Sequence, residues 1–326
     1  MEVKIVPFEI FDISKLKLLS LSDRKHDFHV NEILSIDDPL PRLNDHTALN
    51  PICDAIIKAK EENASVILMY GAHVIKRGMS RFLIRLIEDG FVTHLATNGA
   101  GVIHDFELAM VGGTTECVER YISEGQFGLW HETGLINEAV LNGVKDNLGF
   151  GESVGRYIVD NNFPHMECSV LAACYRKKIP LTVHVGIGCD IVHEHPNCDG
   201  GAIGKTSMTD FLIYAKSVEN LENGVFLNIG SAVIGPEVYL KCLAMARNVA
   251  HQENRKITNF TTVVFDIQPI TGNTNKAPPK TNPQYYYRPW KTILARTVSD
   301  GGKSYYINGD HQATLGNLTR KLINWG

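Results

Sequence analysis

Short, continuously apolar segments alternate with amphipathic segments along most of the chain, and this alternation restricts the possible folds more than any other feature. The apolar segments are SVILMYGAH (65–73), VTHLAT (92–97), IPLTVHVGIG (179–188), VFLNIGSAVIG (225–235) and FTTVVFDI (260–267). Strands that are buried on both faces read as unbroken apolar runs, and they belong to parallel sheets covered by helices. We therefore predict an α/β fold in which helices cover both faces of a parallel sheet.

The segments between these strands have the spacing of amphipathic helices. The clearest one begins at Asn50, a capping residue followed by Pro51, and it places Ile52 and Ile56 on one face. Further helices are expected at 79–90, 153–161, after residue 164, at 207–224 and at 236–250. Residues 1–50 are polar and irregular. We expect them to form an N-terminal arm that wraps the core or meets another subunit, ahead of a single domain at 51–326.

Composition excludes several classes of protein. The chain has 326 residues and a net charge of −4, so nothing indicates a basic surface for nucleic acid or for an anionic membrane. Every apolar run is shorter than the roughly 20 residues of a membrane helix, and the first residues lack the pattern of a signal peptide. The seven cysteines are widely spaced and form no CxxC pair. We expect a cytoplasmic protein that acts on a small molecule and binds neither nucleic acid nor membrane.

A long polar segment interrupts the alternation at 268–291. It reads QPITGNTNKAPPKTNPQYYYRPWK, and its last part is aromatic and basic. Polar loops of this length in a compact domain are usually functional or disordered. We expect a lid or active-site loop whose Tyr287, Arg288 and Trp290 contact the substrate. The alternative is a surface strand that packs on a neighbouring subunit.

Glycine follows four of the apolar runs. The positions are Gly71, then Gly99 and Gly101, then Gly186 and Gly188, and finally Gly230 and Gly235. In an open parallel sheet, ligands bind across the carboxyl ends of the strands, where turns without side chains let backbone N–H groups reach a phosphate. Every strand-to-helix turn favours a small residue, but four such turns together favour a nucleotide site. None of them completes the GxGxxG motif of dinucleotide-binding proteins.

One loop carries candidate metal ligands. His193, His195 and Cys198 lie in CDIVHEHPNCDGG (189–201), and with a distant fourth ligand such as His184 they would support a zinc-dependent hydrolase. Their spacing matches no common closed zinc site, and a hydrogen-bonding loop at a strand end accounts for the same residues. We therefore expect no metal and keep the hydrolase as an alternative.

The segment YGAHVIKRGMSRFLIRLIEDGFVTHLATNGAGVIHDFEL (70–108) resembles deoxyhypusine synthase. Later segments follow the same order, including RPWKTI (288–293), similar to the stretch that holds the family's catalytic lysine, and NGDHQATLGNL (308–318), similar to its last NAD-binding turn. The resemblance covers about residues 50–325. It implies a Rossmann-like fold, NAD bound at the strand ends, and a dimer of dimers with sites near the subunit interface.

Carried over position by position, the resemblance also implies site residues. The NAD contacts would be His73, Thr97, Asn98, Gly99, Gly101, Asp105, Asp190, Gly230, Ser231 and Asp310. The catalytic lysine would be Lys291. It directly follows Trp290, whereas the family's lysine comes two residues after its tryptophan, and in a strand that shift would turn the side chain to the opposite face.

The substrate pocket of the family is not reproduced. Ile103 and His104 stand where the family has the acidic residues that hold the nicotinamide ribose, and Pro236 and Glu237 replace its pair of histidines. A chain that keeps the NAD turns and changes the pocket is expected to have a different substrate. We do not predict deoxyhypusine synthesis.

Two functions follow besides the hydrolase. The first is an NAD-dependent transferase or oxidoreductase that acts on a small polar metabolite, with amine-bearing compounds among the candidates. NAD would take a hydride from a carbon bonded to nitrogen or oxygen, and Lys291 would trap the product as a Schiff base. Glu237, His104 or His193 would act as the base. The second is a non-catalytic nucleotide-binding module.

Overall fold

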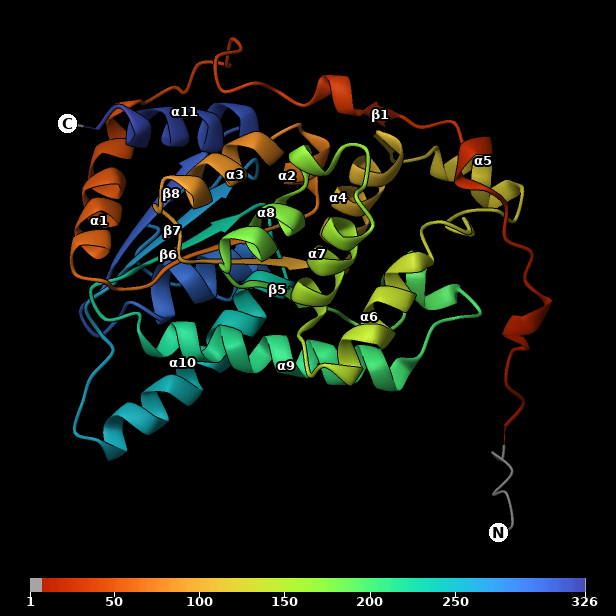
Figure 1. Cartoon of the computed structure of the whole chain (residues 1–326). Helices are drawn as coiled ribbons and strands as arrows, with labels where there is room; N and C mark the ends of the chain where they lie inside the picture. Colours follow the sequence, from red (N-terminus) through yellow and green to blue (C-terminus); the bar gives the residue numbers. More distant parts are fainter. Residues whose placement is uncertain (1–7, 326) are drawn as a thin grey trace.

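A six-stranded parallel sheet forms the centre of the protein in the computed structural model, which describes residues 8–325 (Figure 1). Its strands lie in the order β5-β3-β2-β6-β7-β8. They are β2 (Val66–Tyr70), β3 (His94–Asn98), β5 (Leu181–His184), β6 (Val225–Ile229), β7 (Thr261–Asp266) and β8 (Lys303–Asn308). The predicted α/β parallel sheet is confirmed, and β8 is added to the five predicted strands.

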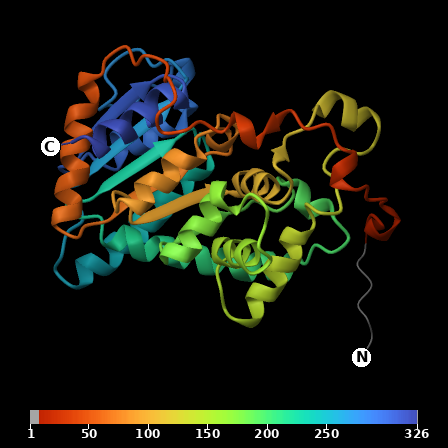
Figure 2. The same ribbon diagram turned by 45° about the horizontal axis from the view of Figure 1, so that its top comes forward.

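Helices cover both faces of this sheet (Figures 1 and 2). The α-helices are α1 (Asn50–Glu61), α2 (His73–Lys76), α3 (Ser80–Glu88), α4 (Gly99–Val111), α5 (Val118–Ser123), α6 (Leu135–Lys145), α7 (Phe150–Asp160), α8 (Val170–Lys177), α9 (Gly200–Glu219), α10 (Ile234–Gln252) and α11 (His311–Ile323). A π-helix, η8 (Pro289–Arg296), follows the long polar loop. Helices α1, α3, α4, α8 and α11 pack on one face, and α9, α10 and η8 pack on the other.

Two hydrophobic cores result from the alternation of side chains along each strand. Val66, Leu68 and Tyr70 of β2 join the core under α1 and α3, whereas Ile67 and Met69 join the core under α9 and α10. Successive residues of a strand point to opposite faces, so a strand with helices on both sides has to be apolar at every position. This geometry explains the continuous apolar runs of the sequence.

The described part of the N-terminal arm runs along the outside of this body (Figures 1 and 2). Its short strand β1 (Phe28–His29) pairs antiparallel with β4 (Gly113–Thr114), which follows α4. Leu21 packs with Tyr121 and Trp130 in a small separate core. The arm is therefore held by the segment between α4 and α6, through the β1–β4 pair and through this small core.

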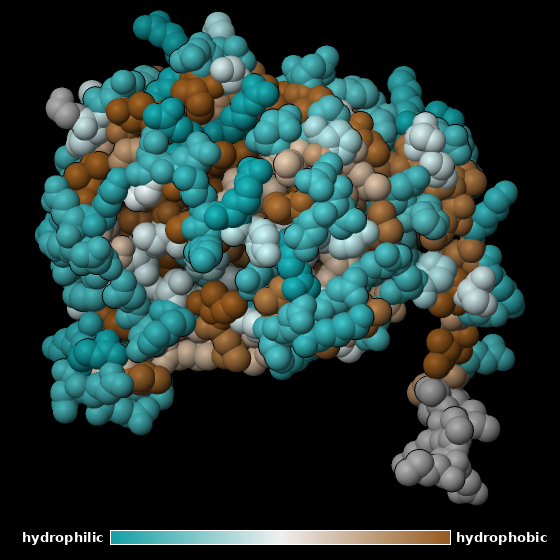
Figure 3. All heavy atoms as spheres, viewed as in Figure 1, coloured by the Kyte–Doolittle hydropathy of each residue, from teal (hydrophilic) through white to brown (hydrophobic). Residues whose placement is uncertain are grey.

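The visible surface is mainly hydrophilic, with separate hydrophobic patches (Figure 3). Phe8, Ile10 and Phe11 at the start of the described arm are exposed. Within residues 8–325, no helix combines the length and the apolar composition that crossing a membrane requires.

The structure corrects the expected role of Asp105, which was predicted to contact NAD. Its side chain is fully buried on α4, and its two carboxylate oxygens accept hydrogen bonds from the hydroxyl of Ser169 and from the backbone N–H groups of Val170 and Leu171 at 2.5–3.2 Å. Burial raises the pKa of Asp105 to about 6, although these three donors oppose the change. Asp105 thus holds the first turn of α8 against α4.

We expect Asp105→Asn to lower the free energy of unfolding at pH 8 by about 3 kcal/mol, because the amide NH₂ would face groups that are themselves donors. Urea unfolding followed by circular dichroism measures this change. Asp54→Asn, the same substitution at an exposed position of α1, is the control and should change stability by less than about 0.5 kcal/mol. Equal effects of the two substitutions would contradict the structural role of Asp105.

Candidate cofactor edge and adjoining cavity

The strand order reverses between β2 and β6. The chain proceeds from β2 through β3 to β5 on one side, and from β6 through β7 to β8 on the other. In open parallel sheets, ligands bind at the carboxyl ends of the strands beside such a switch point. Here the two backbones nearly touch, because a Cβ on Gly71 would lie 2.3 Å from the carbonyl oxygen of Gly230. Only glycine fits at residue 71 without moving β6.

Gly230 has a left-handed backbone and lies against a buried histidine. Its φ is +63°, and a Cβ there would lie 2.5 Å from Nε2 of His311. The His311 ring meets that of His73 edge to face, with ring centroids 6.2 Å apart. Burial lowers the pKa of both histidines. Nδ1 of His311 is buried and has no hydrogen-bond partner among the described residues.

Besides the short helix α2, helices α4, α11 and α10 begin at this edge of the sheet, and the first turns of α4 and α11 already face a carboxylate. Asn98 caps α4 by accepting from the N–H of Gly101 at 3.0 Å, and Asp190 lies so close to Gly99 that a Cβ there would be 2.1 Å from its Oδ2. Burial raises the pKa of Asp190. Asp310 caps α11 and also pairs with Arg77 at 3.0 Å.

The third helix, α10, has no side-chain cap at its N-cap residue. That residue is Val233, which is 60% exposed. The turn before it is fixed by Ser231, whose hydroxyl accepts from the N–H of Gly235 at 2.9 Å and whose carbonyl accepts from the amide of Asn228 at 2.9 Å. The first turn of α10 thus presents the positive end of the helix dipole without a carboxylate at its N-cap.

Nine of the ten residues predicted to contact NAD lie at this edge or directly behind it. They are His73, Thr97, Asn98, Gly99, Gly101, Asp190, Gly230, Ser231 and Asp310. Thr97 is buried behind the edge, where its hydroxyl donates to the carbonyl of Tyr70 at 3.0 Å and joins the ends of β3 and β2. Asp105 is the exception, because it is buried between α4 and α8.

A cavity of about 280 Å³ adjoins the first turn of α4. Its lining includes Asp190 and His104, which the sequence predicted as site residues, and charged side chains that it did not predict. The lining residues are Arg24, Lys76, Ala100, Ile103, His104, Glu107, Thr115, Glu116, Val118, Phe127, Cys189, Asp190 and Ile191. A larger cavity, of about 600 Å³, lies beside α7 and α8 and is lined by residues at the start of β5, far from the carboxyl ends of the strands.

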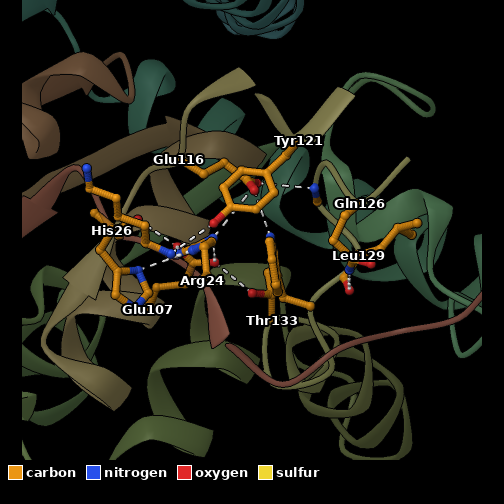
Figure 4. A network of polar contacts seen from close by, with 12 residues as sticks. Arg24, His26, Glu107, Glu116, Tyr121, Gln126, Leu129 and Thr133 are labelled. Carbon is orange, nitrogen blue, oxygen red and sulfur yellow. Dashed lines mark hydrogen bonds and ion pairs between the residues drawn. The ribbon is translucent and has the colours of Figure 1, made fainter. Parts of the chain in front are cut away.

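Two residues that line the smaller cavity, Arg24 and Glu107, form a buried ion pair. Figure 4 shows this pair within its network of polar contacts. Arg24 of the arm donates to both carboxylate oxygens of Glu107 on α4, at 3.0 and 2.6 Å. Thr114 and Thr133 each donate to one of the same oxygens, at 2.7 and 2.6 Å. Burial alone would raise the pKa of Glu107, but the charge of Arg24 and these four hydrogen bonds lower it below its ordinary value. Glu107 is therefore ionised at neutral pH.

The structure places Lys291 differently from the expectation. It lies in the first turn of η8, so the argument about a shift of one residue in a strand does not apply to it. Its side chain is buried, and its ammonium lies 3.5 Å from the centre of the Tyr285 ring. Lys291 does not line the smaller cavity.

The other two candidate bases also lie outside the cavity. Glu237, in the first turn of α10, pairs with Lys241 and Arg288, and the hydrogen bond from Lys241 lowers its pKa. His193 accepts from the N–H groups of Gly188 and Asp190 through Nδ1, both at 3.2 Å, and so closes the loop after β5.

The candidate metal ligands of the alternative hydrolase are not gathered into a site among the described residues. His195 is buried and bonded through Nε2 to the carbonyl of Gly128 at 2.8 Å, while His193 has the loop contacts given above. His184, proposed as a fourth ligand, is instead bonded to Thr182 at 3.1 Å. Residues 8–325 contain no group of three His, Cys, Asp or Glu side chains that could hold a metal ion.

The long polar loop is fastened at several points. The hydroxyl of Tyr287 donates to Asp266 at 2.6 Å, and the indole of Trp290 donates to the carbonyl of Lys276 at 3.0 Å. Tyr287 thus brings the end of the loop to the carboxyl end of β7. Its role as a lid stays a prediction.

No family model and no curated protein matches the chain. Among solved structures, a ternary complex of AgrE with ornithine and NAD⁺ is similar, with a TM-score of 0.54 and 18% identity over 86% of this chain. A conserved putative LOR/SDH protein from Methanococcus maripaludis S2 has a TM-score of 0.52 and 15% identity, covering 90% of this chain and 72% of that one. The chain spans about a third, 33%, of the AgrE chain.

These likenesses establish a Rossmann-like fold. A putative deoxyhypusine synthase from Entamoeba histolytica is also similar, with a TM-score of 0.45 and 10% identity over 85% of this chain and 87% of that one. Likeness at that level assigns no family, so the resemblance to deoxyhypusine synthase stays a prediction.

We expect Gly71→Ala to lower the free energy of unfolding by about 3 kcal/mol, because its Cβ meets the backbone of β6 rather than a movable side chain. Gly204→Ala is the matched control. Residue 204 lies inside α9, and a Cβ added there would have no other atom within 4 Å, so alanine should stabilise the protein by up to about 1 kcal/mol. Thermal or urea unfolding measures both. A neutral Gly71→Ala would mean that the two strand ends are not held together.

Proposed function

We propose that the chain binds NAD across the carboxyl edge of its sheet and catalyses an NAD-dependent reaction on a small amine-bearing metabolite. The contact between Gly71 and Gly230 at the switch point carries this proposal. It keeps side chains out of the crevice in which dinucleotides lie in Rossmann-like folds. NAD⁺ supplies the site with a hydride acceptor.

The helix ends differ in what they could bind. The first turns of α4 and α11 face Asp190 and Asp310, and carboxylates of this kind accept hydrogen bonds from ribose hydroxyls in other dinucleotide sites. The N-cap residue of α10, Val233, has no side-chain cap, although Ser231 accepts from the N–H of Gly235 and Glu237 in the first turn pairs with Lys241 and Arg288. We therefore assign the pyrophosphate of NAD to the α10 turn at 231–235, and the riboses to Asp190 and Asp310.

The cavity beside α4 supports an amine as substrate. Three acidic residues, Glu107, Glu116 and Asp190, and two basic residues, Arg24 and Lys76, line this cavity, which gives its lining a formal net charge of −1. A cationic group entering there would be attracted. AgrE, which shares the fold, has been solved with ornithine and NAD⁺. That pairing of an amine-bearing ligand with NAD⁺ supports the same combination here.

We expect isothermal titration calorimetry to show binding of NAD⁺ or NADH, and Val233→Asp to weaken that binding at least tenfold. The new carboxylate would cap α10 and repel a pyrophosphate at the same N–H groups. Val233→Asn is the matched control, because it caps the helix without adding charge and should weaken binding less. Absence of binding at millimolar NAD⁺ and NADH would overturn the proposal. Equal affinities of the Asp and Asn variants would contradict the assignment of the pyrophosphate to the α10 turn.

A non-catalytic nucleotide-binding module remains the second candidate, because the edge of the sheet would serve it equally well. It differs from the enzyme in turnover. Incubation with NAD⁺ and a panel of amino acids and polyamines, followed at the absorbance of NADH, separates the two. We expect Lys291→Ala to keep its NAD affinity within about twofold of the wild type, since Lys291 lies outside both the edge and the cavity. Retained turnover in that variant would contradict the predicted Schiff-base role of Lys291.

A further inference from the structure

The hydrogen bonds around the small cavity determine which ring nitrogen of His104 carries a hydrogen. We infer that Nε2 of His104 is a bare acceptor that binds the ammonium group of the substrate, and that Arg24, Glu107 and Thr114 are the positioning residues that keep it bare. This inference rests on the proposed function for the identity of the cavity as the substrate pocket. It deepens that proposal by naming the group that recognises the amine.

Glu107 determines which group donates and which accepts in each of these hydrogen bonds. An ionised carboxylate can only accept, and Glu107 accepts from Arg24 twice, from Thr133 and from Thr114. Arginine is always charged and has no acceptor. The single hydroxyl hydrogen of Thr114 is therefore committed to Glu107.

His104 must then donate to Thr114. Its Nδ1 lies 2.8 Å from the Thr114 hydroxyl oxygen, and that oxygen has no second hydrogen to offer. A neutral imidazole carries one N–H, so a hydrogen on Nδ1 leaves Nε2 with a lone pair. Among the described residues, Nε2 makes no hydrogen bond, and His104 lines the cavity.

The ring is neutral at physiological pH. Burial lowers the pKa of His104 to about 4. Glu107 opposes this change, whereas the charged groups of Lys76 and Arg24, together with His73, favour it. Glu116 and Asp190 also line the cavity.

A neutral acceptor beside carboxylates selects for a particular ligand. An ammonium has three donors and a positive charge, so it can donate to His104 while the carboxylates of Glu116 and Asp190 offset its charge. A carboxylate or phosphate would meet a lone pair and a net negative wall, and both features disfavour it. The pocket thus favours a primary amine over an anion.

The tautomer can be measured directly by ¹⁵N–¹³C NMR of histidine-labelled protein at pH 7, with the His104 signals assigned by comparison with His104→Asn. We expect the Nδ1–H form in the wild type and in Thr114→Ser, which keeps the hydroxyl. In Thr114→Val, where Nδ1 loses its acceptor, the Nε2–H form should become detectable. An Nε2–H tautomer in the wild type overturns the inference even if the valine variant fails to fold. A folded valine variant with an unchanged tautomer overturns the positioning role of Thr114.

Ligand choice is tested on the same signals with propylammonium chloride and sodium propionate as probes. We expect saturable shifts of the His104 resonances with propylammonium and at least tenfold weaker binding of propionate. In calorimetry, His104→Asn should lose the binding of propylammonium that the wild type shows. Equal responses to both probes overturn the inference. Neither experiment contains NAD. A failure of this inference is therefore distinguishable from a failure of the proposed function, which would appear as absence of NAD binding in the calorimetry described above.

Discussion

The approach of two backbones at the centre of the sheet is the constraint on which the rest of the structure depends. β2 and β6 are neighbours where the chain reverses its direction across the sheet, and Gly71 and Gly230 let their carboxyl ends meet without side chains. Any larger residue at 71 would push β6 away. Because the first turns of α4, α10 and α11 follow directly from strands of this sheet, their positions relative to one another depend on the same contact.

A second constraint joins the arm to the site. Arg24 and Glu107 are both almost fully buried, and their charges are paired in bidentate geometry with all carboxylate acceptors used. A buried pair adds little net stability, but losing one partner leaves an uncompensated charge and costs about 3–5 kcal/mol. The pair therefore fixes where the arm lies. Through Thr114 and His104 it also connects the arm to the chemistry of the cavity.

The sequence predicted the sheet better than its surroundings. Five strands were predictable because burial on both faces leaves an apolar signature, whereas β8 is an edge strand with a partly exposed, polar sequence, KSYYIN. For Lys291 the consequence of a one-residue shift was argued for a strand, and the structure makes that segment helical. Asp105 was placed at the cofactor from the resemblance, yet its position inside α4 turns it toward α8.

The sequence by itself determined a parallel α/β sheet and the glycines that follow its strands, since both appear in local composition, as runs that are apolar at every position and as small residues directly after them. Only the tertiary structure decided what surrounds those glycines. It brought Arg24 to Glu107 across 83 positions of sequence and Asp190 to Gly99. It also set Thr114 between Glu107 and His104. Such contacts leave no pattern in the sequence, because hydrogen-bond direction and tautomer depend on which distant groups the packing places within about 3 Å.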